Sequence, residues 1–224
     1  MNLSLKQRFD NVLSGIDQAA QASGRNPDSI KLIVVTKFQP VESLREAESL
    51  GYHRFGESRV QELLLKVPQL PAGCEWHFIG PLQVNKVSKV LPHVSLIHSV
   101  DNLKVAQKIS SVAQQPTAVL LQVNVSGEAS KQGLSPVDWE ARLDEVNLLP
   151  HLEICGLMTM APFVQDEKVL RTCFRTLYEL LHKWKPRMRN PSLFKELSMG
   201  MSNDYPLAVQ EGATMVRIGS ALFK

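Results

Sequence analysis

Residues 30–40 read IKLIVVTKFQP, and this stretch indicates the fold of the whole chain. Five apolar residues surround one lysine, Lys31, and four of the five are β-branched. A short run of this kind that ends at a turn predicts a strand buried on both faces, which is typical of a parallel sheet. The rest of the chain is therefore expected to supply further strands of such a sheet.

Lys37 lies at the carboxyl end of this predicted strand. We expect its ammonium group to be partly desolvated there, and desolvation lowers the pKa of a lysine. A neutral amine is a nucleophile, so Lys37 is a candidate for a lysine that forms a Schiff base. The alternative is a strand-end lysine whose side chain reaches solvent, as most lysines do.

Seven more apolar runs follow, each bounded by a turn and followed by a helical pattern. The predicted strands occupy residues 30–35, 52–55, 76–79, 95–99, 117–125, 152–158, 194–197 and 214–218. The predicted helices occupy residues 40–50, 59–66, 82–91, 102–113 with Asp101 as the cap, 136–148, 166–184, 204–211 and a last turn from Gly219. A polar loop is expected at residues 126–133, and one extra helix at residues 3–21 within the leading segment 1–24.

Strands that alternate with helices in this way demand a parallel sheet. Eight such units predict a closed (β/α)8 barrel of the TIM type, in which residues 1–224 form a single domain. No linker rich in Gly, Ser or Pro divides the chain. An open doubly wound sheet is the alternative, but no G-x-G-x-x-G motif follows the first strand.

The composition excludes several classes of protein. Hydrophobic residues make up 44% and charged residues 21%, which is the balance of a soluble globular protein. No apolar run approaches the length of about 18 residues that spans a bilayer. The three cysteines are far apart, and the charged N-terminus is unlike a signal peptide, so we expect a cytoplasmic protein without a structural metal site.

Two turns near the carboxyl terminus predict a phosphate site. Residues 198–204, SMGMSND, follow the seventh predicted strand, and residues 217–220, RIGS, follow the eighth. Loops at these two positions form the usual phosphate pocket of a TIM barrel, where glycine amides and serine hydroxyls face the anion. The alternative is two ordinary turns with helix caps.

Other polar residues have more ordinary interpretations. His77 lies in an apolar strand, so we expect a core histidine with satisfied hydrogen bonds rather than an acid or base, and His98 is similar. Glu57 and Arg59 are expected to form a local ion pair.

A basic run surrounds Trp184 and comprises Lys183, Lys185, Arg187 and Arg189. Such a run could bind nucleic acid or another polyanion. We expect instead a solvated helix end, where cations suit the helix dipole. Binding of nucleic acid is therefore not the preferred hypothesis.

The chain resembles the pyridoxal phosphate homeostasis protein family, whose fold is similar to the barrel domain of bacterial alanine racemase. The motifs that carry the resemblance occur in the order of that family and run from Val35 nearly to the end of the chain. They are VTKFQP (35–40), FGESRVQE (55–62), WHFIGPLQVNK (76–86), VNVSGEASKQG (123–133), GLMTM (156–160), LSMGMSNDYPLAV (197–209) and MVRIGSALF (215–223).

The resemblance implies that pyridoxal 5′-phosphate (PLP) is the cofactor and that Lys37 carries it as an internal aldimine. It also implies phosphate contacts from Ser202, Gly219 and Ser220, with the backbone of Met201 nearby. Ser58 stands where the family usually has an asparagine near the cofactor ring, and Val84 replaces a serine of the family motif. Serine is shorter than asparagine and offers fewer donors.

Arg217 is implied to face the ring nitrogen of the cofactor. An arginine does not give up its proton, so it would keep that nitrogen unprotonated. The ring then withdraws electrons weakly, and carbanion chemistry is restrained.

The resulting hypothesis is a monomeric protein that stores, delivers or buffers PLP without a turnover reaction, with PLP-dependent apo-enzymes as possible partners. The alternative is a PLP-dependent amino-acid racemase or decarboxylase. Racemases with a related barrel carry a second β-rich domain and a tyrosine acid/base on the partner subunit, whereas this sequence is expected to end with the barrel and has only Tyr52, Tyr178 and Tyr205.

Overall fold

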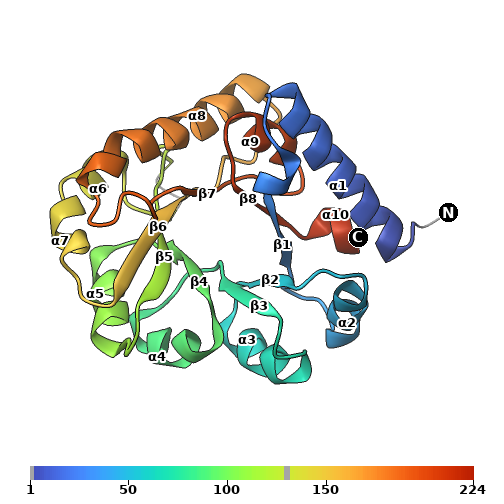
Figure 1. Ribbon diagram of the computed structural model, residues 1–224, viewed down its shortest axis with the longest axis horizontal. Coiled ribbons are helices and arrows are strands. Elements are labelled where there is room, and N and C mark those ends of the chain that lie inside the picture. The colour runs from blue at the N-terminus through green and yellow to red at the C-terminus, as the bar shows by residue number, and fades with distance from the viewer. Residues whose placement is uncertain (1–2, 129–131) are drawn as a thin grey trace.

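Eight parallel strands close into a barrel in the computed structural model, which describes residues 3–128 and 132–224. The strands follow one another in sequence order, and the last pairs with the first through Ile33 and Arg217, among other residues. Helices surround this ring (Figure 1). The predicted (β/α)8 barrel is therefore confirmed.

The strands lie close to their predicted positions. They are β1 (Lys31–Val35), β2 (Arg54–Glu57), β3 (Glu75–Phe78), β4 (Leu96–Val100), β5 (Thr117–Gln122), β6 (Leu152–Met158), β7 (Glu196–Ser198) and β8 (Met215–Ile218). Three differ noticeably, because β2 spans Arg54–Glu57 rather than residues 52–55, β5 ends at Gln122 rather than at residue 125, and β7 begins at Glu196 rather than at residue 194.

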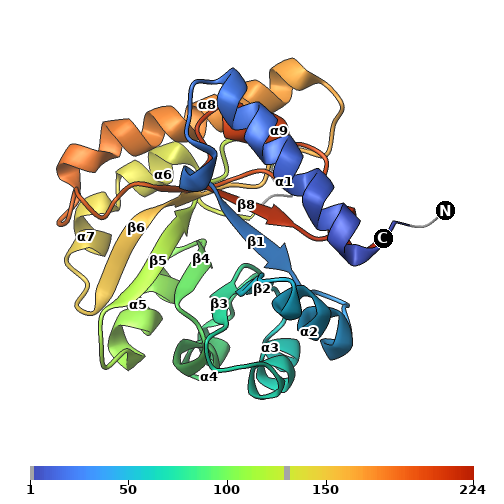
Figure 2. The same cartoon turned by 45° about the vertical axis from the view of Figure 1, so that its right-hand side comes forward.

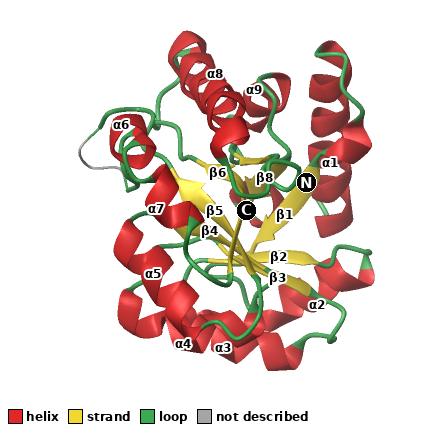
Figure 3. Ribbon diagram, turned by 60° about the vertical axis from the view of Figure 1, so that its left-hand side comes forward, coloured by secondary structure: helices red, strands yellow, loops and turns green. Residues whose placement is uncertain are grey.

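The helices of the described residues cover the outside of the barrel (Figure 3). They are α1 (Leu5–Ala22), α2 (Val41–Ser49), α3 (Val60–Lys66), α4 (Val87–Val90), α5 (Leu103–Val112), α6 (Pro136–Glu140), α7 (Leu143–Asn147), α8 (Glu167–Trp184), α9 (Tyr205–Gln210) and α10 (Ser220–Phe223). Within this part of the chain, no helix is both long enough and apolar enough to cross a membrane.

Two helices that the pattern predicted as continuous are interrupted. The predicted helix 82–91 consists of the short helix α4 between two 3₁₀ turns, and proline in the second turn lacks the N–H that an α-helix would use. The predicted helix 136–148 consists of α6 and α7, with a backbone turn at Arg142 between them. Trp139 of α6 is tied to the end of β5, because its Nε1 donates to Gln122 O at 2.8 Å.

The predicted cap of α5 is wrong by one residue. Asn102, not Asp101, caps this helix, because its side-chain oxygen accepts the backbone N–H of Val105 at 3.0 Å. Asp101 instead accepts a hydrogen bond from Asn102 Nδ2 at 2.7 Å. Of the predicted loop 126–133, residues 129–131 lie outside the described residues.

The extra N-terminal helix packs over the closing side of the barrel. Figure 2 shows α1 running beside α9, and α1 also packs against α10. Phe9, Val12 and Ile16 recur at helical spacing, and all three are buried. Gly15 permits a close approach, because a Cβ at this position would collide with the hydroxyl oxygen of Tyr205.

The interior of the barrel combines a small apolar layer with a polar one. Ile33, Leu96, Leu120, Met158 and Met215 form the apolar layer. Several polar side chains are also buried within the strands, and four of them are joined by hydrogen bonds, namely His77, His98, Ser198 and Arg217. Buried polar groups require hydrogen-bond partners. These four residues are therefore candidates for a shared network below the mouth of the barrel.

Candidate functional site

A cleft of about 1440 Å³ lies at the carboxyl ends of the strands. Because all strands are parallel, their carboxyl ends meet at this one mouth. Every site residue that we predicted from the sequence lines the cleft. These residues are Lys37, Ser58, Met201, Ser202, Arg217, Gly219 and Ser220.

Lys37 lies in the turn that follows β1. Thr36 before it is fully buried, whereas Lys37 and Phe38 are exposed. We expected the ammonium group of Lys37 to be partly desolvated, and this expectation is wrong. Lys37 follows the last residue of β1, where the chain leaves the barrel and enters the open cleft. Phe38 adopts a φ of 64°, which is uncommon for a residue with a bulky side chain.

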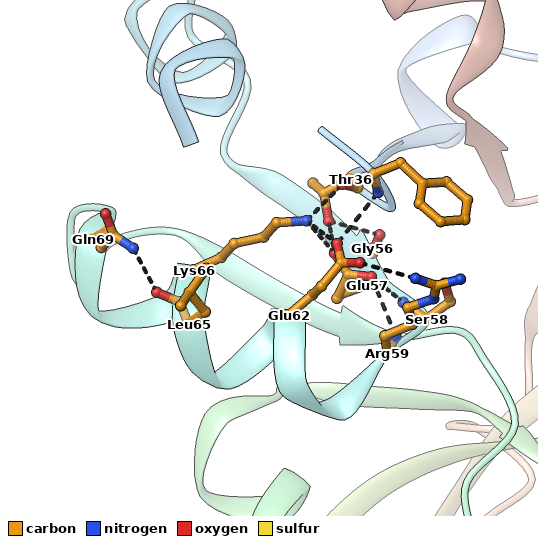
Figure 4. A network of polar contacts seen from close by, with 10 residues as sticks. Thr36, Gly56, Glu57, Ser58, Arg59, Glu62, Leu65, Lys66 and Gln69 are labelled. Atoms are coloured by element: carbon orange, nitrogen blue, oxygen red, sulfur yellow. Dashed lines mark hydrogen bonds and ion pairs between the residues drawn. The ribbon is translucent and has the colours of Figure 1, made fainter. Parts of the chain in front are cut away.

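The end of β2 meets this turn through a network of buried charges (Figure 4). Lys66 is 3% exposed and Glu57 is 0% exposed, and Lys66 Nζ lies 2.8 Å from Glu57 Oε2 and 2.6 Å from Glu62 Oε2. Lys66 also donates to Thr36 O at 2.7 Å. Burial acts to raise the pKa of Glu62, but its contacts with Lys66 lower that pKa overall.

The predicted ion pair between Glu57 and Arg59 is wrong. Glu57 accepts hydrogen bonds from the backbone N–H groups of Ser58 and Arg59, at 2.7 and 3.2 Å, and its charge is paired with Lys66. The guanidinium of Arg59 lies 3.5 Å from Glu62 and 4.3 Å from the centre of the Phe38 ring. The sequence signal that could have identified Lys66 is its position four residues after Glu62 on one helix.

Ser58 is half-buried on the same wall of the cleft. The loops after β2 and β3 touch here, because a Cβ on Gly80 would collide with the backbone oxygen of Ser58. Glycine is therefore required at residue 80 to leave Ser58 in place.

The two predicted phosphate turns lie side by side. Ser202 Oγ, in the turn after β7, accepts hydrogen bonds from the backbone N–H groups of Gly219 and Ala221, at 3.3 and 3.2 Å. Two amides of the turn after β8 thus converge on one oxygen atom. The first turn is held by Asp204, whose Oδ1 accepts the N–H of Met201 at 2.5 Å, and burial raises the pKa of this carboxyl.

Arg217 is the residue before the last of β8, lies inside the barrel and is 4% exposed. Its Nη1 donates to Ser198 Oγ at 2.5 Å, and its Nη2 donates to Thr159 O at 2.8 Å. Arg217 thus has neutral acceptors, one on β7 and one in the turn after β6, and no salt bridge to a carboxylate among the described residues. Burial lowers the pKa of Arg217 to about 10, against the opposing charge of Asp204, so the side chain stays charged at neutral pH.

A line of hydrogen bonds continues from Arg217 through the barrel. Ser198 Oγ lies 2.7 Å from His98 Nδ1, His98 Nε2 lies 2.8 Å from His77 Nδ1, and His77 Nε2 lies 2.9 Å from Glu75 Oε1. Our expectation of a satisfied core histidine is confirmed for His77 and His98. The sequence did not reveal that both histidines lead to Arg217, because Ser198 and His98 are 100 residues apart.

One assignment of protons satisfies every contact in this line. Ser198 donates its hydroxyl proton to His98 Nδ1, and each histidine donates its Nε2–H to the next residue. Burial lowers the pKa of His98 well below its ordinary value, and the positive charge of Arg217 acts in the same direction. The hydrogen bond from His77 lowers the pKa of Glu75 to about 2.

The basic run at residues 183–189 faces acidic neighbours. Lys183 Nζ lies 2.8 Å from Glu140 Oε2, and Arg187 lies 3.3 Å from Asp144 Oδ1. Arg189 donates to backbone oxygens, among them Leu152 O at 2.7 Å. Because these cations have partners within the chain, the contacts favour a structural helix end over a surface for nucleic acid.

Comparison with known proteins gives close relatives over nearly the full length. The family described as alanine racemase, N-terminal domain, matches residues 15–224. A pyridoxal phosphate homeostasis protein from Pseudomonas aeruginosa is 41% identical, with 98% of this chain and 95% of the relative covered. A protein of the same name from Aquifex aeolicus is 40% identical, with 97% and 96% covered.

Solved structures agree with the sequence comparison. PipY of Synechococcus elongatus, described as having PLP bound, superposes with a TM-score of 0.81 at 35% identity, over 94% of this chain and 100% of that one. Alanine racemase from Corynebacterium glutamicum superposes with a TM-score of 0.72 at 14% identity, over 96% of this chain and 61% of that one. The second comparison supports the fold alone.

Proposed function

Because this chain belongs to the pyridoxal phosphate homeostasis protein family, we propose that it binds pyridoxal 5′-phosphate in the cleft and serves vitamin B6 homeostasis without a turnover reaction. The observation that carries the proposal is that Lys37, Arg217 and the two glycine-serine turns line one cleft. PLP is an aromatic aldehyde with a phosphate group. An amine can bind its aldehyde, a cation can face its ring, and an anion-binding turn can hold its phosphate.

The turns after β7 and β8 fit the phosphate. The amides of Gly219 and Ala221 already converge on the hydroxyl oxygen of Ser202, so their N–H groups point to a place where an oxygen can lie. Ser202 and Ser220 add hydroxyl donors at the edge of the cleft. We propose that these residues, with the backbone of Met201, hold the phosphate.

Lys37 fits the role of the amine that binds the aldehyde. Its neutral amine would add to the aldehyde carbon, and one water molecule would leave. Lys37 is exposed in an open cleft, so the bond that it forms remains accessible to water and to competing amines. Such access suits a protein that takes up and releases the aldehyde.

Arg217 supports binding rather than turnover. It has no acceptor group and stays protonated at neutral pH, so it would leave the ring nitrogen without a proton. When bound, PLP supplies an electron sink, and that sink is weaker when the ring nitrogen is unprotonated. Ser58, which follows β2 and also lines the cleft, would lie near the ring.

The positions of the tyrosines also favour this proposal over a racemase. All three belong to the described residues, and none of them lines the cleft. Tyr52 stacks on Phe9 at a centroid distance of 3.7 Å, Tyr178 contacts His182 on α8, and Tyr205 packs beside Gly15. In the monomer that we propose, a tyrosine that exchanged a proton with a bound substrate would have to belong to this chain and reach the cleft.

Absorbance and mass spectra test the proposal together. The wild-type protein mixed with PLP is expected to show the absorbance band of an imine, and borohydride reduction is expected to leave the added mass on Lys37. Lys37→Ala is expected to lose both signals, whereas Lys183→Ala, an exposed control, keeps them. An unchanged spectrum in Lys37→Ala would refute the assignment.

We further propose a cytoplasmic monomer that passes the cofactor to PLP-dependent apo-enzymes. The three cysteines, Cys74, Cys155 and Cys173, are free, which suits a reducing compartment. Light scattering of the purified protein tests whether it is a monomer. Transfer assays with an apo-enzyme test whether it passes the cofactor on. A stable dimer, or transfer no faster than from free cofactor, would contradict them.

A further inference from the structure

The turn that carries Lys37 is fastened to the barrel by a buried lysine to which the proposed function gives no role. Building on that function, we propose that Lys66, with Glu57 and Glu62, positions Lys37 by holding the backbone on both sides of it. Figure 4 shows Lys66 reaching from α3 toward Thr36, with Glu57 and Glu62 around its ammonium group.

The contacts reach the residue before Lys37 and the residue after it. On one side, Thr36 O accepts from Lys66 at 2.7 Å, and Thr36 Oγ1 donates to Glu57 Oε2 at 2.7 Å. On the other side, the N–H of Phe38 donates to Glu62 Oε2 at 3.3 Å. Since Lys66 also binds both carboxylates, one ammonium group connects the two ends of the turn.

The conformation of Phe38 indicates that the turn is held in place. A positive φ at a bulky residue persists only where the surrounding structure over-determines it. Phe38 is 66% exposed, so burial of its ring does not account for its conformation. The backbone hydrogen bond from Gln39 N to Thr36 O, at 3.0 Å, closes the turn around Phe38, and the N–H bond to Glu62 and the Arg59 guanidinium over the ring restrain it further.

Burial of the charges argues that the network has more than a stabilising role. A buried ion pair costs desolvation that its attraction often fails to repay, so a well-packed apolar pair would serve stability equally well. Charged and directional contacts are instead suited to fixing one geometry at a functional site. The network lies directly behind the amine that the proposed function requires.

Lys66 is not itself a second reactive amine. An ammonium group has three N–H donors, and those of Lys66 meet Thr36 O, Glu57 and Glu62. Its side chain is 3% exposed and is not part of the lining of the cleft. Lys66 therefore acts on the cofactor site through the backbone beside Lys37.

A paired substitution tests this role without leaving an unpaired buried charge. The test variant is Lys66→Met with Glu57→Gln, which removes both charges together. The control is Lys183→Met with Glu140→Gln, which removes an exposed pair with the same 2.8 Å separation. Each protein is titrated with PLP and with pyridoxine 5′-phosphate, which has an alcohol in place of the aldehyde.

A positioning role predicts different results for the two ligands. Imine formation with PLP is expected to weaken by about 10-fold or more, because misplacing a reacting group by about 1 Å can cost about 100-fold. Affinity for pyridoxine 5′-phosphate is expected to stay within about twofold, since the phosphate turns belong to other strands. The control variant is expected to match the wild type with both ligands.

Two results would overturn the inference. If imine formation is unchanged in the test variant, Lys66 does not position Lys37. If both ligands weaken equally, the network supports the fold and not the amine. Should the test variant fail to fold, Glu62→Met replaces it, because Glu62 is 24% exposed and methionine removes the oxygen that accepts the N–H of Phe38. The same split between the two ligands is then required.

The wild-type measurement separates this inference from the proposed function. A wild-type protein that forms no imine at Lys37 would refute the function and the inference together. A wild-type protein that forms the imine, with an unaffected test variant, would refute the inference alone.

Discussion

Arg217 Nη1 donates to the hydroxyl oxygen of Ser198 at 2.5 Å, and the same hydroxyl is hydrogen-bonded to His98. Ser198 is fully buried, so neither partner can be replaced by bulk water. The orientation of Arg217 at the mouth of the barrel therefore depends on side chains that lie below the cleft. Removing any one of these side chains is therefore expected to change the hydrogen bonds of the others.

Ser198→Ala is expected to lower the free energy of unfolding by about 1–3 kcal/mol, because Arg217 and His98 each lose a buried hydrogen-bond partner. Urea denaturation measures the effect. Ser99→Ala is the matched control, since the hydroxyl of Ser99 is buried without a partner among the described residues. The control substitution is expected to be neutral or stabilising, and equal losses in both variants would contradict the role of Ser198.

His98 is expected to make the protein less stable as the pH falls below about 6.5. Its folded-state pKa is lowered by burial, so below its unfolded pKa of about 6.5 the unfolded chain binds more protons and stability declines. One such group contributes a slope of up to about 1.4 kcal/mol per pH unit. Unfolding between pH 7 and 5 should therefore have a shallower pH dependence in His98→Gln, and identical slopes would refute the assignment.

Ser202→Ala is expected to weaken the phosphate site selectively. The hydroxyl of Ser202 joins the two turns, and loss of one hydrogen-bonding group corresponds to roughly 1 kcal/mol, or about fivefold in affinity. PLP and pyridoxine 5′-phosphate should weaken by similar factors in a titration. Pyridoxal, which lacks the phosphate, should bind equally to both proteins, and a loss confined to pyridoxal would argue against this site.

Gly200→Ala is expected to destabilise the turn after β7. Gly200 has a φ of 92°, and a Cβ there would lie 2.6 Å from the Cβ of Ala208. Strain at such a position costs about 1–3 kcal/mol. Gly73→Ala is the control, because a Cβ added at Gly73 would have no atom within 4 Å. Thermal unfolding should give a lower midpoint temperature for Gly200→Ala than for Gly73→Ala. An unchanged midpoint in Gly200→Ala would show that the turn can relax without cost.

The sequence by itself was sufficient for the order of the strands and for seven of the residues that line the cleft. Apolar periodicity reports burial, burial sets the strands and helices, and parallel strands bring their carboxyl ends to one mouth. Local pattern was less reliable where the chain bends, as at Arg142, because tertiary contacts such as that of Trp139 override helical propensity.

Only the tertiary structure decided which charges and hydrogen bonds are shared. Glu57 was expected to pair with Arg59 but pairs with Lys66, and His98 meets Ser198 across 100 residues of sequence. The exposure of Lys37 was likewise not apparent from its position after a buried strand. A charged or polar group takes whichever partner the closed barrel places within about 3 Å, and that distance is set by strands that are remote in sequence.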